Sequence, residues 1–369
     1  MKTVYILGAG FSVEAGAPTQ AAIIREAFRL HTESPELFIQ ERFHIFTTFI
    51  RDQLNISDES FSSIDLEDIF TPLDRCLSEN SQFRGIGLDT IMAVREAVFY
   101  VVGRTIQILL DRTEKEKDYI NSFANHLTLK ASARTSGNYK LTDPVSVIST
   151  NWDILLDTSI YQALHSNERY NGVVDYCCYI SSKDESDVTV TPGLEKLGQG
   201  GFNVKLLKLH GSLNWLQCPR CARLYASFSY KDAMLSFDKN ISCRHCDGNF
   251  PEENGKHILS ANLIMPTYLK DLSNPQYRII WQNAGIEISE ADEIVFIGYS
   301  LPYADFEMRQ LLSRMTRRHA RIRVVDFVSE NDDKGRKEAI MLHWTKFFGK
   351  REITFSFDGA KSFVESLAS

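Results

Sequence analysis

The chain has 369 residues, of which 43% are apolar and 24% are charged, and its formal net charge is −7. This length allows two domains or one large domain with insertions. The negative charge argues against strong binding to nucleic acids or anionic membranes, and no run of about 18 uncharged apolar residues predicts a membrane span. The seven cysteines lack the pattern of a disulfide framework, and no signal peptide is recognised. We therefore expect a cytoplasmic protein.

The first eighteen residues carry the first functional signal. The short apolar run 4–7 is typical of a buried parallel strand. Gly8 and Gly10 then allow the backbone to turn sharply, and Ser12 is predicted to cap a following helix whose free N–H groups would face an anion. Strand, glycine turn and helix form the layout that seats a dinucleotide pyrophosphate. Because a third glycine is missing, an ordinary tight turn is an equal alternative.

A long helical region follows. The ranges 38–54, 65–77 and 88–110 have the spacing of amphipathic helices, and strand signals are nearly absent from 35 to 133. This region is interpreted as a helical insertion into an α/β domain. Its paired carboxylates Glu67 and Asp68 raise an acid/base role, but the solvated first turn of a helix is the favoured interpretation.

Polar side chains follow two further predicted strands. The run 145–150 leads to Asn151 and Asp153, and the run 204–209 leads to His210. Open α/β sheets place their ligands at the carboxyl ends of parallel strands. A lone histidine is often only structural, so a functional and a structural role for His210 are weighed equally.

Two Cys-x-x-Cys pairs form the strongest local motif: Cys218 with Cys221, and Cys243 with Cys246. Four thiolates at this spacing predict a closed tetrahedral zinc site, with no position left for water or substrate. The zinc would be structural, holding a small ribbon that lacks a core of its own. A thioredoxin-like redox role for one pair is the less favoured alternative, and His245 could replace a cysteine as ligand.

The remaining strands are predicted at 258–265, 293–297 and 321–325, all in the same sheet. Asp326 follows the last of these strands, where it could accept a hydrogen bond from a ribose hydroxyl or cap a helix. The basic cluster from 314 to 323 is interpreted as a solvated face, with a protein or nucleic-acid contact as the alternative.

Taken together, several motifs resemble the sirtuin family and occur in that family's order. They are Gly-Ala-Gly-Phe-Ser at 8–12, Thr-Asn-Trp-Asp at 150–153, Leu-His-Gly at 209–211, the paired cysteines, and Ile-Gly-Tyr-Ser-Leu at 297–301. The resemblance covers about residues 1–30 and 145–330. It implies a Rossmann-like domain that binds NAD, a small zinc domain, and cleavage of the nicotinamide–ribose bond.

The resemblance also implies roles for single residues. Asn151 and Asp153 would lie in the nicotinamide and ribose pocket, and His210 would be the general base. The NAD-binding residues would be Gly8, Ala9, Gly10 and Ser12 around the pyrophosphate, and Gly298 and Ser300 over the phosphates or the adenine ribose. To these we add Asp326 as a candidate, because of its position after the predicted strand at 321–325 and not because of the resemblance.

Departures from the family pattern bear on the reaction. Deacylases of the family carry Asp-Phe-Arg after a Gly-Ile-Pro step, whereas Gly16-Ala17-Pro18 here runs into Thr19-Gln20-Ala21, without the arginine. The strand that would hold an acyl-lysine peptide has become Ile-Met-Pro-Thr at 264–267. The helical insertion stands where a cofactor loop would be. This pattern resembles the sirtuin-like NAD hydrolases of bacterial antiphage defence, in which water captures the ribosyl centre to give nicotinamide and ADP-ribose.

We therefore predict an NAD hydrolase with structural zinc. Its activity would be controlled by homo-oligomerisation or by a partner ATPase or nuclease, and the prediction of a partner is based on family analogy alone. The alternatives are an NAD-dependent deacylase or ADP-ribosyltransferase and, from another class, a non-catalytic scaffold that senses NAD or ADP-ribose. The predicted fold is a Rossmann-like α/β domain formed by residues 1–34, 141–216 and 256–369. It carries a helical insertion at 35–140 and a zinc-ribbon subdomain at 217–255.

Overall fold

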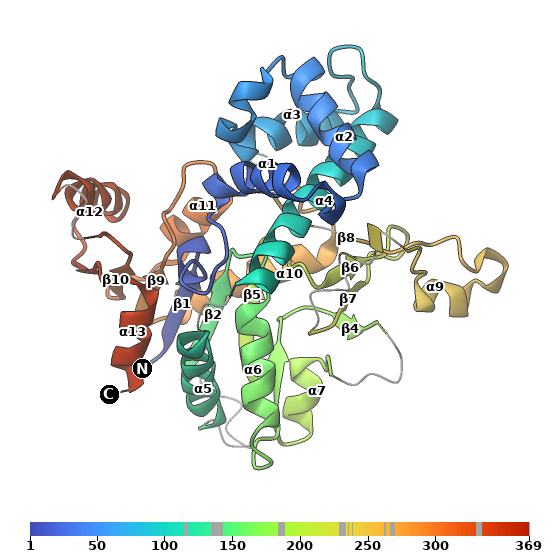
Figure 1. Ribbon diagram of the computed structural model, residues 1–369. Helices are drawn as coiled ribbons and strands as arrows, with labels where there is room; N and C mark the ends of the chain where they lie inside the picture. The colour runs from blue at the N-terminus through green and yellow to red at the C-terminus, as the bar shows by residue number, and fades with distance from the viewer. Residues whose placement is uncertain are drawn as a thin grey trace.

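The computed structural model describes residues 1–113, 117–133, 143–183, 189–228, 234, 236–237, 239–261, 263–265, 270–329 and 334–368. Its centre is a seven-stranded sheet in the order β11-β10-β9-β1-β2-β5-β3, in which every pair of neighbours is parallel (Figure 1). The strands are β1 (Thr3–Leu7), β2 (Val145–Ser149), β3 (Gly172–Asp175), β5 (Phe202–Lys208), β9 (Glu293–Ile297), β10 (Arg321–Val325) and β11 (Ile353–Ser356). The predicted Rossmann-like fold is confirmed.

Helices cover the sheet, which is why its middle strands are continuous apolar runs. α5 (Asp118–Ser132) contacts β2 and β5 and packs against α6 (Leu155–His165) and α13 (Gly359–Ala368), whereas α10 (Pro275–Glu290) contacts β5 and α11 (Phe306–Met315). α12 (Lys334–Phe348) adds Trp344, whose ring centroid lies 4.5 Å from that of Phe296 on β9. α5 had no counterpart among the predicted helices.

A layer of helices stands beyond the carboxyl ends of the strands (Figure 1). It contains α1 (Ile23–Glu33), α2 (Gln40–Thr48), α3 (Leu66–Glu79) and α4 (Leu88–Arg112), with a π-helix, η4 (Phe49–Gln53), continuing α2. Two short 3-10 turns connect these helices, η3 (Pro35–Leu37) and η5 (Asp58–Ser63), while η1 (Ala9–Phe11) follows β1 and η2 (Gln20–Ala22) precedes α1. The three helices predicted in this region are confirmed, with ends displaced by a few residues.

A second sheet lies beside the first and has four short strands in the order β4-β7-β6-β8. They are β4 (Ile180–Ser182), β6 (Trp215–Gln217), β7 (Leu224–Ala226) and β8 (Ser260–Ala261), and α9 (Arg244–Asn249) extends from them. The prediction that 258–265 returns to the large sheet is wrong, because β8 pairs antiparallel with β6.

The strands on either side of residues 176–179 belong to different sheets. β3 belongs to the large sheet and β4 to the small one, and between them Cys177 adopts a left-handed backbone with φ +56°. An L-residue in this conformation interrupts an extended strand. A short helix, α7 (Gly193–Gly198), follows. Residues 134–140, residue 188 and the Pro-Thr pair at 266–267 lie outside the described residues.

Within the part of the chain that the structure describes, no helix combines the length and the apolar character needed to cross a membrane.

Candidate functional site

Two glycine turns meet at the point where the strand order reverses. β1 lies between β2 and β9, so the chain leaves β1 toward one side of the sheet and later continues through β9 toward the other. In open α/β sheets ligands bind at this switch point. Gly10 N donates to Gly298 O at 2.9 Å, and Gly8 N donates to Ile297 O at 3.1 Å. The turns after β1 and β9 are therefore in direct backbone contact.

The space between these turns excludes side chains. A Cβ at Gly8 would stand 2.6 Å from Gly298 O, and a Cβ at Gly10 would stand 2.7 Å from Gly298 Cα. Gly298 has φ +60°, and a Cβ there would stand 2.3 Å from the carbonyl carbon of Gly10. The glycines at 8, 10 and 298 are thus required for contact between two pieces of backbone, whatever ligand approaches them.

Ser12 has a different position from the one predicted. It ends the 3-10 turn η1, and the first α-helix begins only at Ile23, so the prediction that Ser12 caps a helix is wrong. Its N–H donates to Ala9 O, and its hydroxyl is buried between two predicted site residues, 3.4 Å from Asn151 Nδ2 and hydrogen bonded to Asp153. Ser12 holds the polar residues after β1 and β2 together and is not among the residues that line the cavity.

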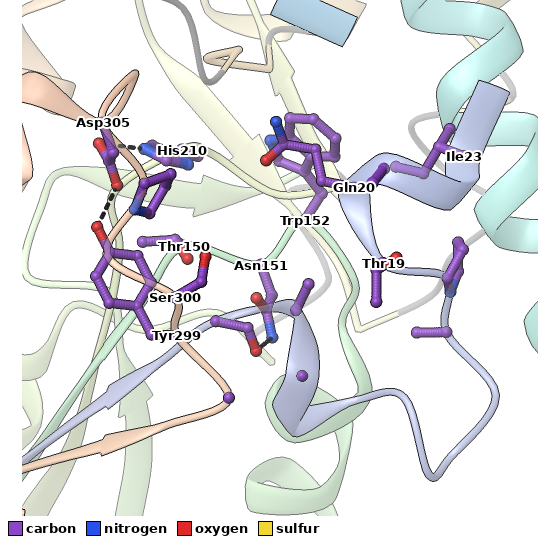
Figure 2. A pocket seen from close by; sticks show the side chains of 18 of the residues that line it. Thr19, Gln20, Ile23, Thr150, Asn151, Trp152, His210, Tyr299, Ser300 and Asp305 are labelled. Atoms are coloured by element: carbon purple, nitrogen blue, oxygen red, sulfur yellow. Dashed lines mark hydrogen bonds and ion pairs between the residues drawn. The ribbon is translucent and has the colours of Figure 1, made fainter. Parts of the chain in front are cut away.

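A cavity of about 670 Å³ opens beside the glycine turns (Figure 2). This volume lies in the range of small-molecule and cofactor sites. The residues that line it come from the turns after β1, β2, β5, β9 and β10 and from the helical layer. Those from the predicted site are Gly8, Ala9, Gly10, Asn151, Asp153, His210, Gly298, Ser300 and Asp326.

Asn151 lies near the middle of the cavity wall, with Thr150 and Ser300 close to it in Figure 2. Its amide nitrogen donates to Gly8 O at 2.9 Å, and its backbone N–H donates to Ser149 Oγ at 3.2 Å. With the amide nitrogen engaged by the β1 turn, the amide has one fixed orientation. A fixed amide can orient a ligand group without losing rotamer freedom on binding.

Asp153 lies at the start of α6 and is buried. Its Oδ1 accepts a hydrogen bond from Leu155 N at 3.1 Å. Burial raises the pKa of Asp153, and the nearby ammonium of Lys208 opposes this rise. Lys208 is 1% exposed and donates to the Asp153 carbonyl at 2.6 Å, and it pairs with Asp157 Oδ2 at 3.1 Å. The buried ammonium of Lys208 therefore lies next to Asp153, a residue that lines the cavity. No sequence motif indicated this cation.

His210 follows β5 and faces a carboxylate that was not among the predicted site residues. His210 Nε2 lies 3.5 Å from Asp305 Oδ1. Tyr299 donates its hydroxyl to Asp305 Oδ2 at 2.7 Å, and Lys270 Nζ lies 2.9 Å from Oδ1. Figure 2 shows the tyrosine and the histidine directed at the same carboxyl group. A polar residue closely preceding a late helix was the only sequence signal for Asp305.

The far wall of the cavity comes from the helical layer. Asp65, Glu67 and Asp68 at the start of α3 line it, together with Gln20, whose Nε2 donates to Glu67 Oε1 at 2.6 Å. Burial raises the pKa of Glu67, while its own backbone N–H and Gln20 oppose the rise. Glu67 and Asp68 do lie in the first turn of α3, as interpreted, and Asp68 is exposed, but Glu67 is partly buried in the cavity wall.

The lining as a whole is acidic. The carboxylates are Asp65, Glu67, Asp68, Asp153, Asp305 and Asp326, and the one arginine or lysine among the described lining residues is Arg336 on α12. Asp326 Oδ1 accepts a hydrogen bond from Phe327 N at 2.8 Å, and burial raises the pKa of Asp326 against the opposing charge of Arg336. Such a lining favours positive charge in the ligand, while Arg336 is the group able to pair with a phosphate.

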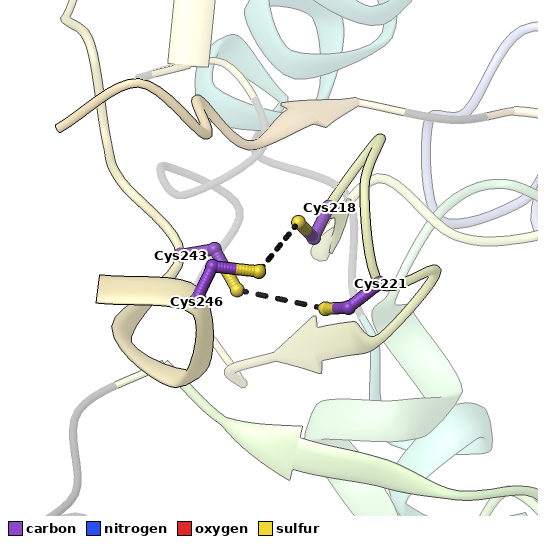
Figure 3. Close-up of side chains that lie close together, drawn as sticks. All are labelled: Cys218, Cys221, Cys243 and Cys246. Atoms are coloured by element: carbon purple, nitrogen blue, oxygen red, sulfur yellow. Dashed lines mark hydrogen bonds between the residues drawn. The ribbon is translucent and has the colours of Figure 1, made fainter. Parts of the chain in front are cut away.

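The four paired cysteines converge in the small sheet (Figure 3). The Sγ atoms of Cys218, Cys221, Cys243 and Cys246 all lie within 4.8 Å of one another. Sγ atoms are 3.7 Å apart between Cys218 and Cys246 and 3.8 Å apart between Cys221 and Cys243. Tetrahedral zinc with Zn–S bonds of about 2.3 Å requires sulfurs about 3.8 Å apart. The cysteines therefore fit a structural zinc ion without His245.

The zinc ribbon does have a small core, contrary to the prediction. Leu216, Tyr225 and Leu259 are buried around the cysteines and form a cluster separate from the main core. Apart from the four cysteines, the cluster has these three buried residues and three partly buried ones, Ile241, Phe250 and Ala261, so it is a small unit. A bound ion would therefore supply much of its folding free energy.

No protein-family model matches the sequence, and no curated protein sequence is significantly similar to it. Solved structures similar to the chain include sirtuins. A complex of a Sir2 homologue with NAD has a TM-score of 0.41 and 13% identity, covering 99% of this chain and 87% of that chain. A structure concerned with sirtuin substrate affinity has a TM-score of 0.38 and 13% identity, covering 99% and 91%. A mutant Sir2 homologue bound to ADP-ribose has a TM-score of 0.39 and 15% identity, covering 99% and 90%. Likenesses of this size do not determine the chemistry, which must come from the residues of the site.

Proposed function

We propose that this chain is an NAD hydrolase that cleaves the nicotinamide–ribose bond and releases nicotinamide and ADP-ribose. The main support is that Asn151, Asp153 and His210, which follow neighbouring strands β2 and β5, line one cavity with the glycine turns after β1 and β9. The order of sequence motifs that resembles the sirtuin family supports the same reaction. The cavity would seat NAD, with Gly8, Ala9, Gly10, Gly298, Ser300 and Asp326 around its phosphates and ribose.

The charge of the cavity suits this bond cleavage. As nicotinamide leaves, positive charge builds up on the ribose, and fixed dipoles and carboxylates stabilise it best where water is excluded. Asp153 and the oriented amide of Asn151 would provide this stabilisation. His210 would take the proton of the attacking water, because a histidine can accept a proton near neutral pH.

Two features favour water over a peptide as the acceptor. The arginine that follows the glycine turn in the deacylases is absent, and Thr19, Gln20 and Ala21 stand in its place and line the cavity. Glu67, bonded to Gln20, closes that side of the cavity with a carboxylate from the helical layer. In this proposal the NAD site belongs to a domain formed by residues 1–34, 141–216 and 256–369. Residues 35–140 form an insertion, and residues 217–255 form the zinc-ribbon subdomain.

The proposal is tested by incubating the purified protein with NAD, with and without an acylated peptide. Release of nicotinamide and ADP-ribose without peptide is expected, and a strict requirement for peptide would instead support a deacylase or ADP-ribosyltransferase. Asn151→Ala and His210→Ala should each lower turnover by about 10²–10⁴-fold, while His319→Ala, at an exposed position, should not. If all variants bind NAD and none, including the wild type, cleaves it, the scaffold alternative holds.

An effector role in bacterial antiphage defence is part of the same proposal and rests on the motif resemblance. Uncontrolled NAD depletion would harm the cell, so such an activity needs a gate. Homo-oligomerisation or a partner ATPase or nuclease are the candidates. Comparing NAD turnover at several protein concentrations tests the first of these, since a gate by self-assembly makes specific activity rise with concentration.

A further inference from the structure

A buried network on one side of the cavity holds His210. The His210 side chain is 5% exposed and the Asp305 side chain is 1% exposed. Asp305 comes from the connection between β9 and α11, Lys270 from the segment before α10, and Tyr299 from the turn after β9. All three residues lie outside the Leu-His-Gly motif that contains His210. Both oxygens of the Asp305 carboxyl group have a partner: the Tyr299 hydroxyl donates to Oδ2, and the Lys270 ammonium contacts Oδ1.

The two atoms that face each other across this network are complementary. Among the described residues, His210 Nε2 is buried and makes no hydrogen bond, whereas the buried Asp305 Oδ1 that faces it also contacts the Lys270 ammonium at 2.9 Å. They stand 3.5 Å apart, slightly beyond the usual hydrogen-bond range. Catalytic hydrogen bonds are often long in the free enzyme and tighten when ligand binds. A buried histidine nitrogen without another hydrogen bond and a buried carboxylate oxygen at this distance make one pair, because a carboxylate oxygen can accept from two donors.

The charge state of the carboxyl group fixes which atom donates. Burial alone would raise the pKa of Asp305, but its interactions with His210 and with the Lys270 ammonium and the hydrogen bond from Tyr299 hold it well below its usual range. Asp305 is therefore ionised and can only accept. The ring nitrogen that faces it must carry a proton, so Nε2 is the donor. No hydrogen bond joins Nδ1 to the described residues, and His210 lines the cavity.

We propose that Asp305 is the positioning residue of His210, holding its imidazole with the proton on Nε2 so that Nδ1 presents its lone pair to the cavity. This inference rests on the proposed function for its chemistry. As water attacks C1′ of the ribose, the C–O bond forms and the C–N bond to nicotinamide breaks, with its electron pair passing to the nicotinamide nitrogen. The water's O–H bond breaks, and its proton passes to Nδ1. Tyr299 and Lys270 keep the carboxylate in place throughout.

The first experiment reads the tautomer directly and needs no turnover. Protein labelled with ¹⁵N-histidine is measured by NMR, and the His210 signals are identified as those lost in His210→Ala. The wild type should show a protonated Nε2 and an unprotonated Nδ1. Asp305→Asn has nearly the same shape but can donate as well as accept, so the Nε2–H form should lose its preference. An unchanged tautomer in Asp305→Asn would overturn the proposal, provided that circular dichroism and zinc content show an intact fold.

The second experiment uses the reaction. Asp305→Asn should lower kcat by about 10–100-fold, the loss that follows removal of a partner orienting a histidine, with little change in KM for NAD. Tyr299→Phe, which removes one bond to the carboxylate, should have a smaller effect in the same direction. In a His210→Ala background, Asp305→Asn should cause no further loss, because Asp305 acts through His210. A full further loss would refute this role. If the wild type releases no nicotinamide, the proposed function fails, and the tautomer measurement still decides the role of Asp305.

Discussion

The buried cation behind the cavity gives the most quantitative prediction. Lys208 and Asp157 are each 1% exposed, with Nζ 3.1 Å from Oδ2, and Asp157 Oδ1 accepts a bond from the Tyr176 hydroxyl at 2.8 Å. Lys208→Met removes the charge but keeps the side-chain volume, which leaves a carboxylate in the interior with only the tyrosine as partner. Breaking a buried pair from one side costs about 3–5 kcal/mol. We expect a loss of this size in the free energy of unfolding.

A double-mutant cycle measures whether this cost comes from an unpaired charge. Asp157→Asn alone also leaves a buried ion, whereas Lys208→Met with Asp157→Asn leaves none. The double variant should therefore lose less than the sum of the single losses, by about 0.5–3 kcal/mol, the range found for coupled neighbours. Urea unfolding followed by tryptophan fluorescence provides each value.

Two results would refute the reasoning about Lys208. One is additivity of the two substitutions within about 0.5 kcal/mol. The other is a Lys208→Met loss no larger than that of Lys256→Met at an exposed position, for which about 0.5 kcal/mol or less is expected. Since Lys208 opposes the burial that raises the pKa of Asp153, its removal should also move that pKa further upward. NMR of the Asp153 carboxyl group would detect the change.

Three further predictions concern the glycine contact, the zinc site and acid stability. A left-handed backbone costs an L-residue about 1–2 kcal/mol, and Gly298→Ala should destabilise the fold by more than this, because the new Cβ would also collide with Gly10. The control Gly87→Ala, where a Cβ would have no atom within 4 Å, should leave the thermal unfolding temperature nearly unchanged. Metal analysis should find about one zinc per chain, lost in Cys243→Ser and kept in Cys178→Ser, and a stable metal-free protein would contradict the site. Burial alone would raise the pKa of Glu287, but the ammonium groups of Lys205 and Lys2 lower it below the ordinary value. The ionised Glu287 carboxylate therefore stabilises the fold above about pH 4.3, and this contribution is lost as the pH falls through the lower pKa of the folded state. The stability gap between wild type and Glu287→Gln should therefore narrow as urea titrations move from pH 6 to pH 3, and a constant gap would disprove this assignment.

Local patterns were sufficient to predict most of the fold. The apolar run before Gly8 and the β-branched run before Asn151 specify strands by themselves, and strands that end in polar residues indicate where a site forms. The amphipathic spacing of the helical layer was equally clear. These signals depend only on residues that are near one another in sequence.

Signals that depend on distant partners were missed. The run 258–265 contains a strand, but only its pairing with β6 decides to which sheet that strand belongs. Asp305 looked like a residue that starts a helix, because its contact with His210 exists only after β5 and β9 are placed in the sheet. Lys208 looked like one polar residue in an apolar strand. Ser12 was assigned to a helix start because its real partners, Asn151 and Asp153, are far away in sequence.

The contact between the glycine turns constrains how this protein can evolve. Gly8, Gly10 and Gly298 form a floor made of backbone, where a larger residue at any of the three positions would collide with the opposite turn. New ligand preferences therefore cannot arise there by single substitutions. They can arise in the wall formed by Thr19, Gln20 and the acids at the start of α3, whose side chains have room to vary. Among homologues, this wall should diverge first while the floor stays glycine.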